Sequence, residues 1–256
     1  MTKSSYLTAV LFTTGCIQHT DTETRLVDQE PAAIGQIAKK QPIAFKEAKL
    51  IVEHNSTAED TGFQGFVDGE PWKQLDILDQ DGVSALSITA KGRLRPVGLT
   101  ELFFETDEPP NAEVAIDDML AKLPAGDYRF RGRTVDNITQ LGTATLSHVI
   151  AAGPVVTQPE DGAELPADRD LVFEWEPVTT SIRGDCAVNV THYELIVNKL
   201  DQPLHPGFGR QKLDLWVPAT TTRMRVPHEF LEAGVGYEFE VIAIEAGGAQ
   251  IGRAHV

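Results

Sequence analysis

One pattern occurs twice in this chain and constrains its fold more than any other feature. Residues 123–130, with the sequence LPAGDYRF, are echoed by residues 231–239, with the sequence LEAGVGYEF. Each run leads into an alternating apolar and polar stretch, and a second echo follows, QLGTA at 140–144 and QIGRA at 250–254. A repeat with matching ends predicts two related β-sandwich units in tandem.

The length of 256 residues also favours two domains over one. We place the units at 46–152 and 153–256, behind a signal-like segment at 1–16 and a flexible linker at 17–45. The linker is rich in Gln, Thr, Asp and Glu without sustained periodicity, so it cannot bury enough apolar surface to fold. The expected fold class is therefore all-β, with two tandem sandwiches after a tether.

Short alternating segments separated by turn residues fill the second unit. Alternation puts Phe173 and Trp175 on one face of a strand, and Tyr193 and Leu195 on one face of another. We expect strands in this unit at 153–159, 170–177, 192–197, 212–217, 222–226, 237–244 and 251–256.

Features of the second unit together resemble a fibronectin type III domain. Trp175 lies on the second strand and Tyr193 on the third, and a corner of Leu231, Gly234 and Tyr237 precedes the sixth strand. The resemblance implies that the hydroxyl of Tyr237 closes the cross-over loop by a hydrogen bond to nearby backbone. The physics agrees, because a half-buried ring needs a partner for its hydroxyl and the loop has unpaired backbone groups.

The second unit departs from that family in a long insertion between the second and third strands, at 179–189. The insertion contains Cys186, and His192 follows a few residues later. A catalytic Cys–His pair needs hydrogen-bond reach and an orienting group, and the sequence indicates neither, so we interpret Cys186 as a loop thiol. The loop at 205–209 and Trp216 are weaker candidates for contacts with a ligand.

The first unit repeats the corner as Leu123, Gly126 and Tyr128, and it resembles a more divergent immunoglobulin-like or fibronectin-like sandwich. The apolar run at 102–104 is matched with 213–215, and that at 114–116 with 224–226. We expect a helical turn at 117–123 and strands at 48–55, 62–68, 71–78, 85–90, 99–105, 113–116, 128–134 and 142–148.

The amino terminus has the composition of a targeting segment. A short polar stretch at 1–5 precedes an apolar run at 6–12, and TTGC follows at 13–16. This resembles a bacterial lipoprotein signal, which implies that Cys16 becomes the lipidated first residue of the mature chain. Ile17 stands where an acidic residue would favour inner-membrane retention, so the resemblance implies the outer membrane. The alternatives are another export signal and an ordinary tail.

The net charge of −16 excludes nucleic acid as a partner, because no basic surface is available to neutralise phosphates. No apolar run approaches the roughly 20 residues that span a bilayer, so we expect membrane contact only through a lipid anchor. No phosphate-binding loop, dinucleotide fingerprint, zinc helix or nucleophile elbow is present, and we expect no cofactor and no catalytic residue.

Acidic loops in the first unit raise the question of a cation. Residues 79–82, DQDG, look like the start of an EF-hand loop, but its twelfth position is Ala90 instead of a carboxylate. A looser calcium site could use Asp60 and Asp68, together with Glu53 and Glu59. The alternative is a solvated acidic rim.

These observations favour a non-catalytic cell-envelope lipoprotein that acts as a binding or spacer module, with a protein or glycan partner at the surface. A second hypothesis is an enzyme-associated or calcium-dependent carbohydrate-binding protein that uses the acidic loops of the first unit. A third is a structural subunit of an envelope complex. The sequence identifies no ligand.

Overall fold

The computed structural model describes residues 40–200, 211–246 and 250–255, the last of these through their backbone only. Its regular structure is almost entirely β, which confirms the predicted all-β sandwich class. The helical elements are α1 (Ile116–Leu120), η1 (Gly92–Leu94) and η2 (His228–Phe230). The strands are β1 (Ile43–Ala44), β2 (Glu47–Asn55), β3 (Asp60–Leu78), β4 (Ser84–Thr89), β5 (Leu99–Glu105), β6 (Gly126–Thr134), β7 (Thr139–Leu146), β8 (Val156–Gln158), β9 (Leu171–Trp175), β10 (Val190–Lys199), β11 (Lys212–Pro218), β12 (Arg223–Val226), β13 (Tyr237–Glu245) and β14 (Gln250–His255).

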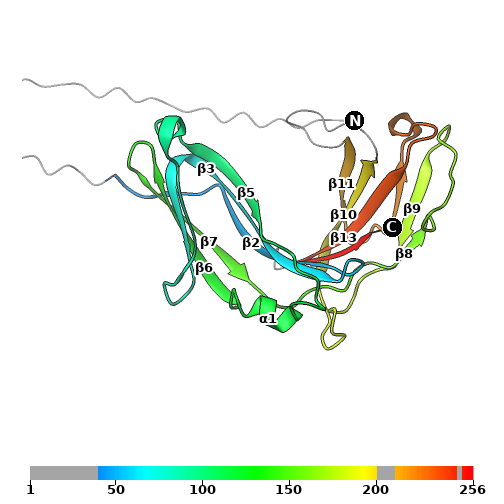
Figure 1. Cartoon of the computed structure of the whole chain (residues 1–256), viewed down its shortest axis with the longest axis horizontal. Helices are drawn as coiled ribbons and strands as arrows, with labels where there is room; N and C mark the ends of the chain where they lie inside the picture. Colours follow the sequence, from blue (N-terminus) through cyan, green and yellow to red (C-terminus); the bar gives the residue numbers. More distant parts are fainter. Residues whose placement is uncertain (1–39, 201–210, 247–249, 256) are drawn as a thin grey trace, which may run out of the picture. The chain divides into compact units, whose positions relative to one another are not determined.

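A single 19-residue strand, β3, organises the first sandwich (Figure 1). Its first half pairs with β2 on one side and β5 on the other, and its second half pairs with β4 and β6. β7 pairs with β6, and the short β1 adds to β7 in parallel. The two halves of β3 therefore belong to two sheets, β2–β3–β5 and β4–β3–β6–β7–β1.

The change of sheet along β3 falls near Gly69 and Pro71. The ladders of β3 with β5 and β6 shift register on either side of Trp72. A Cβ at Gly69 would lie 2.6 Å from Oε1 of Gln140 and 2.7 Å from Cδ1 of Phe45, so only glycine fits this close approach. The two strands predicted at 62–68 and 71–78 are one bent strand.

The core of the first sandwich lies between these sheets, and it follows the alternation that the sequence shows. Along β6, buried Tyr128 and Phe130 alternate with exposed Asp127 and Arg129. The largest fully buried side chains of this core are Trp72, Tyr128, Phe63, Phe130, Leu75, Ile77, Leu146 and Ile150.

The second sandwich has separate strands in the same pairing scheme. One sheet has the order β12–β9–β8, and the other has the order β11–β10–β13–β14 (Figure 1). Phe173 and Phe239 meet edge to face across the core with ring centroids 4.7 Å apart. Trp175 and Tyr193 do the same at 5.5 Å. Each sheet contributes one ring to each pair, so aromatic contacts hold the two sheets together.

Strand pairing corrects the match that the sequence suggested between the two units. β5 pairs with the first half of β3 as β12 pairs with β9, and β4 pairs with the second half of β3 as β11 pairs with β10. Residues 102–104 therefore correspond to β12 and not to 213–215. The extra strand predicted at 113–116 caused the error, because it was matched with residues 224–226 of β12.

The strand predicted at 113–116 is also wrong. The backbone N–H groups of Glu113 and Val114 both donate to the carbonyl of Pro110, at 2.8 and 3.0 Å, which makes a turn. Pro109 and Pro110 cannot donate to a ladder, so this segment leads into α1 as a turn with Val114 against the core.

Strand pairing and the insertion at 179–189 both join the sandwiches. β14 pairs in parallel with β2, from Gln250 opposite Val52 to Arg253 opposite Asn55, which makes one 11-stranded sheet. The insertion at 179–189 also contacts the linker between the units, where the N–H of Ile182 donates to the carbonyl of Ile150 at 3.0 Å. Among the described residues, no helix has the length and apolar character needed to cross a membrane.

Candidate functional site

The two repeated corners are built around a tyrosine hydroxyl. The hydroxyl of Tyr128 donates to the carbonyl of Pro124 at 2.8 Å. The hydroxyl of Tyr237 accepts from the N–H of Glu232 at 2.7 Å and lies 3.3 Å from the carbonyl of Phe230. Burial, with a smaller contribution from the negative charge of Asp79, raises the pKa of Tyr128. Its phenol therefore stays protonated and acts as a structural donor.

Each corner also needs a glycine. Gly126 has a φ of +146° and Gly234 a φ of +78°, values that residues with a side chain rarely adopt. Leu123 and Leu231 precede these glycines and pack against the cores of their sandwiches. The corner residues thus have structural contacts in both units.

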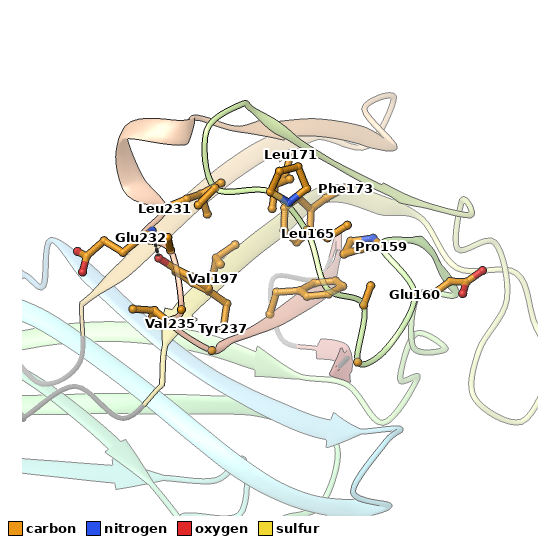
Figure 2. Close-up of a pocket in the computed structure, with 18 of the residues that line it drawn as sticks. Pro159, Glu160, Leu165, Leu171, Phe173, Val197, Leu231, Glu232, Val235 and Tyr237 are labelled. Carbon is orange, nitrogen blue, oxygen red and sulfur yellow. Dashed lines mark hydrogen bonds between the residues drawn. The ribbon is translucent and has the colours of Figure 1, made fainter.

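A mainly apolar pocket with a volume of about 560 Å³ lies beside the second corner (Figure 2). The loop at 159–167 forms one wall, and the corner at 231–237 forms the other. The buried core residues Phe173, Val197 and Phe239 line its base. The pocket therefore opens into the space between the two sheets, and its volume is in the range of sites that hold small ligands.

The two polar side chains on the corner side of the pocket, those of Glu232 and Tyr237, already have partners. The Tyr237 hydroxyl is held by the corner, as described above. The carboxylate of Glu232 accepts from the ammonium of Lys199 at 2.5 Å, and this ammonium lies 5.1 Å from the ring centre of Phe230. The Lys199 side chain is 6% exposed, so this pair fixes the corner to the end of β10. What the pocket offers a ligand is mainly apolar contact.

The structure does not bring the candidate cation ligands Asp60 and Asp68 together. Asp60 pairs with Asn55 at one end of the β2–β3 ladder, and Asp68 pairs with Glu47 at the other. Asp68 comes eight positions after Asp60 along the strand, which is about 26 Å at the usual rise per residue. Asp68 is instead 3.4 Å from the ammonium of Lys46.

The remaining acidic candidates lie at the hairpin end near Asp60. The buried carboxylate of Glu53 accepts a hydrogen bond from the amide of Gln64. Burial lowers the pKa of His54, against smaller opposing effects from Asp60 and Glu59. Among the described residues, none of these carboxylates belongs to a group of three side chains whose potential metal-ligating atoms lie within mutual reach.

The cysteine and loop candidates fall in several places. Cys186 is an exposed free thiol in the insertion at 179–189, beside residues of the linker between the units. His192 lies on β10, where its ring is 6.4 Å from that of Trp216. Cys16 and the loop at 205–209 lie outside the described residues. Trp175 and Tyr193 are buried in the second core, and the Tyr193 hydroxyl accepts from the N–H of Val178 at 2.8 Å.

Two clusters of side chains were not predicted from the sequence, although Trp216 of the second was a candidate on its own. Asp170, His228 and Glu229 come together on the exposed surface, with 3.0 Å between His228 Nδ1 and Asp170 Oδ1. Glu194 and Trp216 face each other across β10 and β11. The second pair has a signal in the sequence, because both residues occupy outward positions of alternating strands. The first has none, because 58 positions separate Asp170 from His228.

No family model matches this sequence, and no curated protein matches it. Solved structures that resemble it include the FN1–FN3 domains of chicken CNTN1, at 9% identity and a TM-score of 0.34 over 84% of this chain and 66% of that one. Another is alpha-2-macroglobulin from Escherichia coli, at 11% identity and a TM-score of 0.27 over 85% and 17%. A third is the BSP domain of a biofilm associated protein, at 16% identity and a TM-score of 0.23 over 81% and 29%.

The chain thus spans less than two thirds of each of these three structures. The fold is therefore assigned from the strand order, the register and the core packing of this chain alone.

Proposed function

We propose that this protein is a non-catalytic binding module of the cell envelope, held to a membrane by a lipid on Cys16. The observation that supports binding is the apolar pocket beside the Tyr237 corner. Its base is formed by core side chains, and Glu232 and Tyr237 in its wall are engaged in structural contacts. A ligand would gain stability there from the burial of apolar surface, at about 25 cal/mol per Å².

The character of the pocket favours binding over chemistry. Among its described lining residues, the titratable side chains are Glu160, Asp161, Glu232 and Tyr237, and the last two are engaged in contacts of the corner. The ligand we propose is a small, mainly apolar group carried by an envelope partner, such as an aromatic side chain.

The test is to fill the pocket from its rim. Ala233 is exposed and lines the pocket, so Ala233→Trp should occupy it without disturbing the core. The readout is the fluorescence of the apolar dye ANS, with Ala58→Trp on an exposed turn of the first sandwich as a matched control. We expect saturable dye binding that is reduced about tenfold by Ala233→Trp and unchanged by Ala58→Trp. Equal dye binding by both variants would refute the assignment of the pocket.

The lipid anchor has its own test. Mass spectrometry of the native amino terminus should show a diacylglyceryl group on Cys16, and Cys16→Ser should move the protein from the membrane fraction to the soluble fraction. An unmodified Cys16 in membrane-bound protein would remove the anchor from the proposal and leave the pocket untouched.

A further inference from the structure

The outward face of β10 and β11 carries an exposed aromatic residue beside a pair of carboxyl groups. Of the three tryptophans in the sequence, Trp72 and Trp175 are 0% and 3% exposed, whereas Trp216 is 59% exposed. Trp216 stands directly opposite Glu194, and Asp214 stands opposite Ile196, the next outward position. The side chains of Glu194, Asp214 and Trp216 do not line the apolar pocket beside the Tyr237 corner.

Glu194 and Asp214 interact through their side chains. The side chains of Asp214 and Trp216 both lie close enough to the Glu194 carboxyl group to affect its pKa. Burial and then Asp214 raise the pKa of Glu194 to about 7. Both effects disfavour the negative charge of Glu194, so this carboxyl group holds its proton more strongly than an ordinary glutamate.

Among the described residues, the charged neighbours of this pair include one ammonium group. The ammonium of Lys212 lies 3.0 Å from Oδ2 of Asp214, and both side chains are partly exposed. On the other side, β13 places Ile242 opposite Glu194 and Glu240 opposite Ile196. His192 lies two positions before Glu194 on the same strand, with its ring toward Trp216.

We propose that this face binds the guanidinium group of an arginine side chain from a partner protein. A guanidinium is planar, always charged, and able both to stack on an indole and to donate two hydrogen bonds to a carboxylate. The site supplies the matching groups: an exposed indole, and a Glu194 carboxylate opposite it that would exchange its proton for the guanidinium. A lysine ammonium has the charge without the plane, and a neutral sugar has neither.

The net charge of −16 agrees with a cationic partner, because the field of the whole protein attracts it. That general attraction does not distinguish arginine from lysine, whereas the indole and carboxylate geometry does. A preference for arginine over lysine would therefore identify binding at the indole and carboxylate of this face.

The experiment uses the full chain with Cys16→Ser and two probes of equal charge, tetra-arginine amide and tetra-lysine amide, at constant ionic strength. Trp216 fluorescence and the three indole N–H signals in NMR report binding, since the other two indoles are buried. We expect the arginine probe to bind about fivefold more tightly than the lysine probe, a difference typical of one cation–π contact.

Three variants locate the effect. Glu194→Gln and Trp216→Leu should each remove this preference, and Asp170→Asn, which deletes an exposed carboxylate elsewhere, should keep it. Trp216→Tyr should retain part of it, which separates loss of the aromatic face from misfolding. Between pH 6 and 8 the affinity for tetra-arginine should rise as Glu194 loses its proton, and Glu194→Gln should abolish the rise.

Two results would overturn the proposal. The first is equal affinity for both probes in the unaltered protein, which would mean non-specific attraction to an acidic surface. The second is a stronger Trp216 response to a neutral oligosaccharide such as maltohexaose, which would make this face a glycan site. Neither result would affect the test of the apolar pocket, because the two sites share no lining residue.

Discussion

The two corners of this protein share a motif and differ in what packs over it. Beside the first corner, the cavity between residues 79–81 and 124–128 is about 30 Å³. Beside the second, the pocket between residues 159–167 and 231–237 is about 560 Å³. Both corners have a tyrosine hydroxyl bonded to the cross-over backbone and a glycine with positive φ.

The turn at 79–82 explains the closed first corner. A Cβ at Gly126 would lie 3.0 Å from Oε1 of Gln80, so the Gln80 side chain fills the space in front of the glycine. At Gly234 the corresponding position is open, with no atom within 4 Å. The comparison shows that the corner motif secures the fold, and that the loops packed against it decide whether a binding site exists.

The largest expected difference between the two sandwiches is in their cores. Phe130 is 1% exposed in the closed unit, whereas Phe239 lines the pocket. Phe130→Ala should lower the free energy of unfolding by about 4 kcal/mol, and Phe239→Ala by about 2 kcal/mol, because the second void joins a space that already exists. Urea unfolding measures both values. A larger loss for Phe239→Ala would show that the pocket is closed in solution.

Removal of the corner hydroxyls should separate the units by a smaller amount. Tyr128 is buried, and Tyr128→Phe leaves the Pro124 carbonyl without its partner, at a cost of about 2 kcal/mol. Tyr237 is partly exposed and Glu232 is exposed, so water can replace the lost bond and Tyr237→Phe should cost about 1 kcal/mol. Chemical denaturation of the two variants under identical conditions gives the comparison. Equal costs would mean that both corners exclude water.

The smallest expected effect is a dependence of stability on pH with opposite sign in the two units. Glu194 keeps a proton in the folded state that the unfolded chain loses above its ordinary pKa of 4.5, so its contribution falls as pH rises from 4.5 to about 7. One pKa unit corresponds to about 1.4 kcal/mol, and screening at this partly exposed position reduces the total effect to about 1 kcal/mol.

His54 acts in the other direction. Burial lowers its pKa below the ordinary 6.5, so the unfolded state binds a proton first and stability falls as pH drops below 6.5. Melting temperatures between pH 5 and 8 should therefore lose their alkaline-side decrease in Glu194→Gln and their acid-side decrease in His54→Asn. A pH profile unchanged by either variant would contradict the assignment of these groups.

Local patterns made the β class, most strand positions and both corners predictable from the sequence. The alternation along residues 126–134 is strong because one face of β6 is buried and the other is exposed, whereas β13 is buried on both faces over residues 239–244. The corner glycines and tyrosines lie within a few positions of each other, so a short window captures the whole motif.

Non-local features were out of reach. Gly69 and Pro71 indicate a strand end, yet β3 continues there because the change of sheet needs no hydrogen bond from Pro71. The pocket depends on how the loop at 159–167 packs against residues 231–237, which no periodicity specifies. The Glu194–Trp216 pair requires the register of β10 with β11, and the Asp170–His228 contact requires the tertiary fold.

The parallel ladder between β2 and β14 has a consequence for biogenesis. β2 is synthesised early and β14 long after it, so the edge of β2 stays uncovered until almost the whole described sequence has been made. Such an edge can pair with a neighbouring chain. A nascent chain stalled before residue 250 should therefore aggregate through its first sandwich.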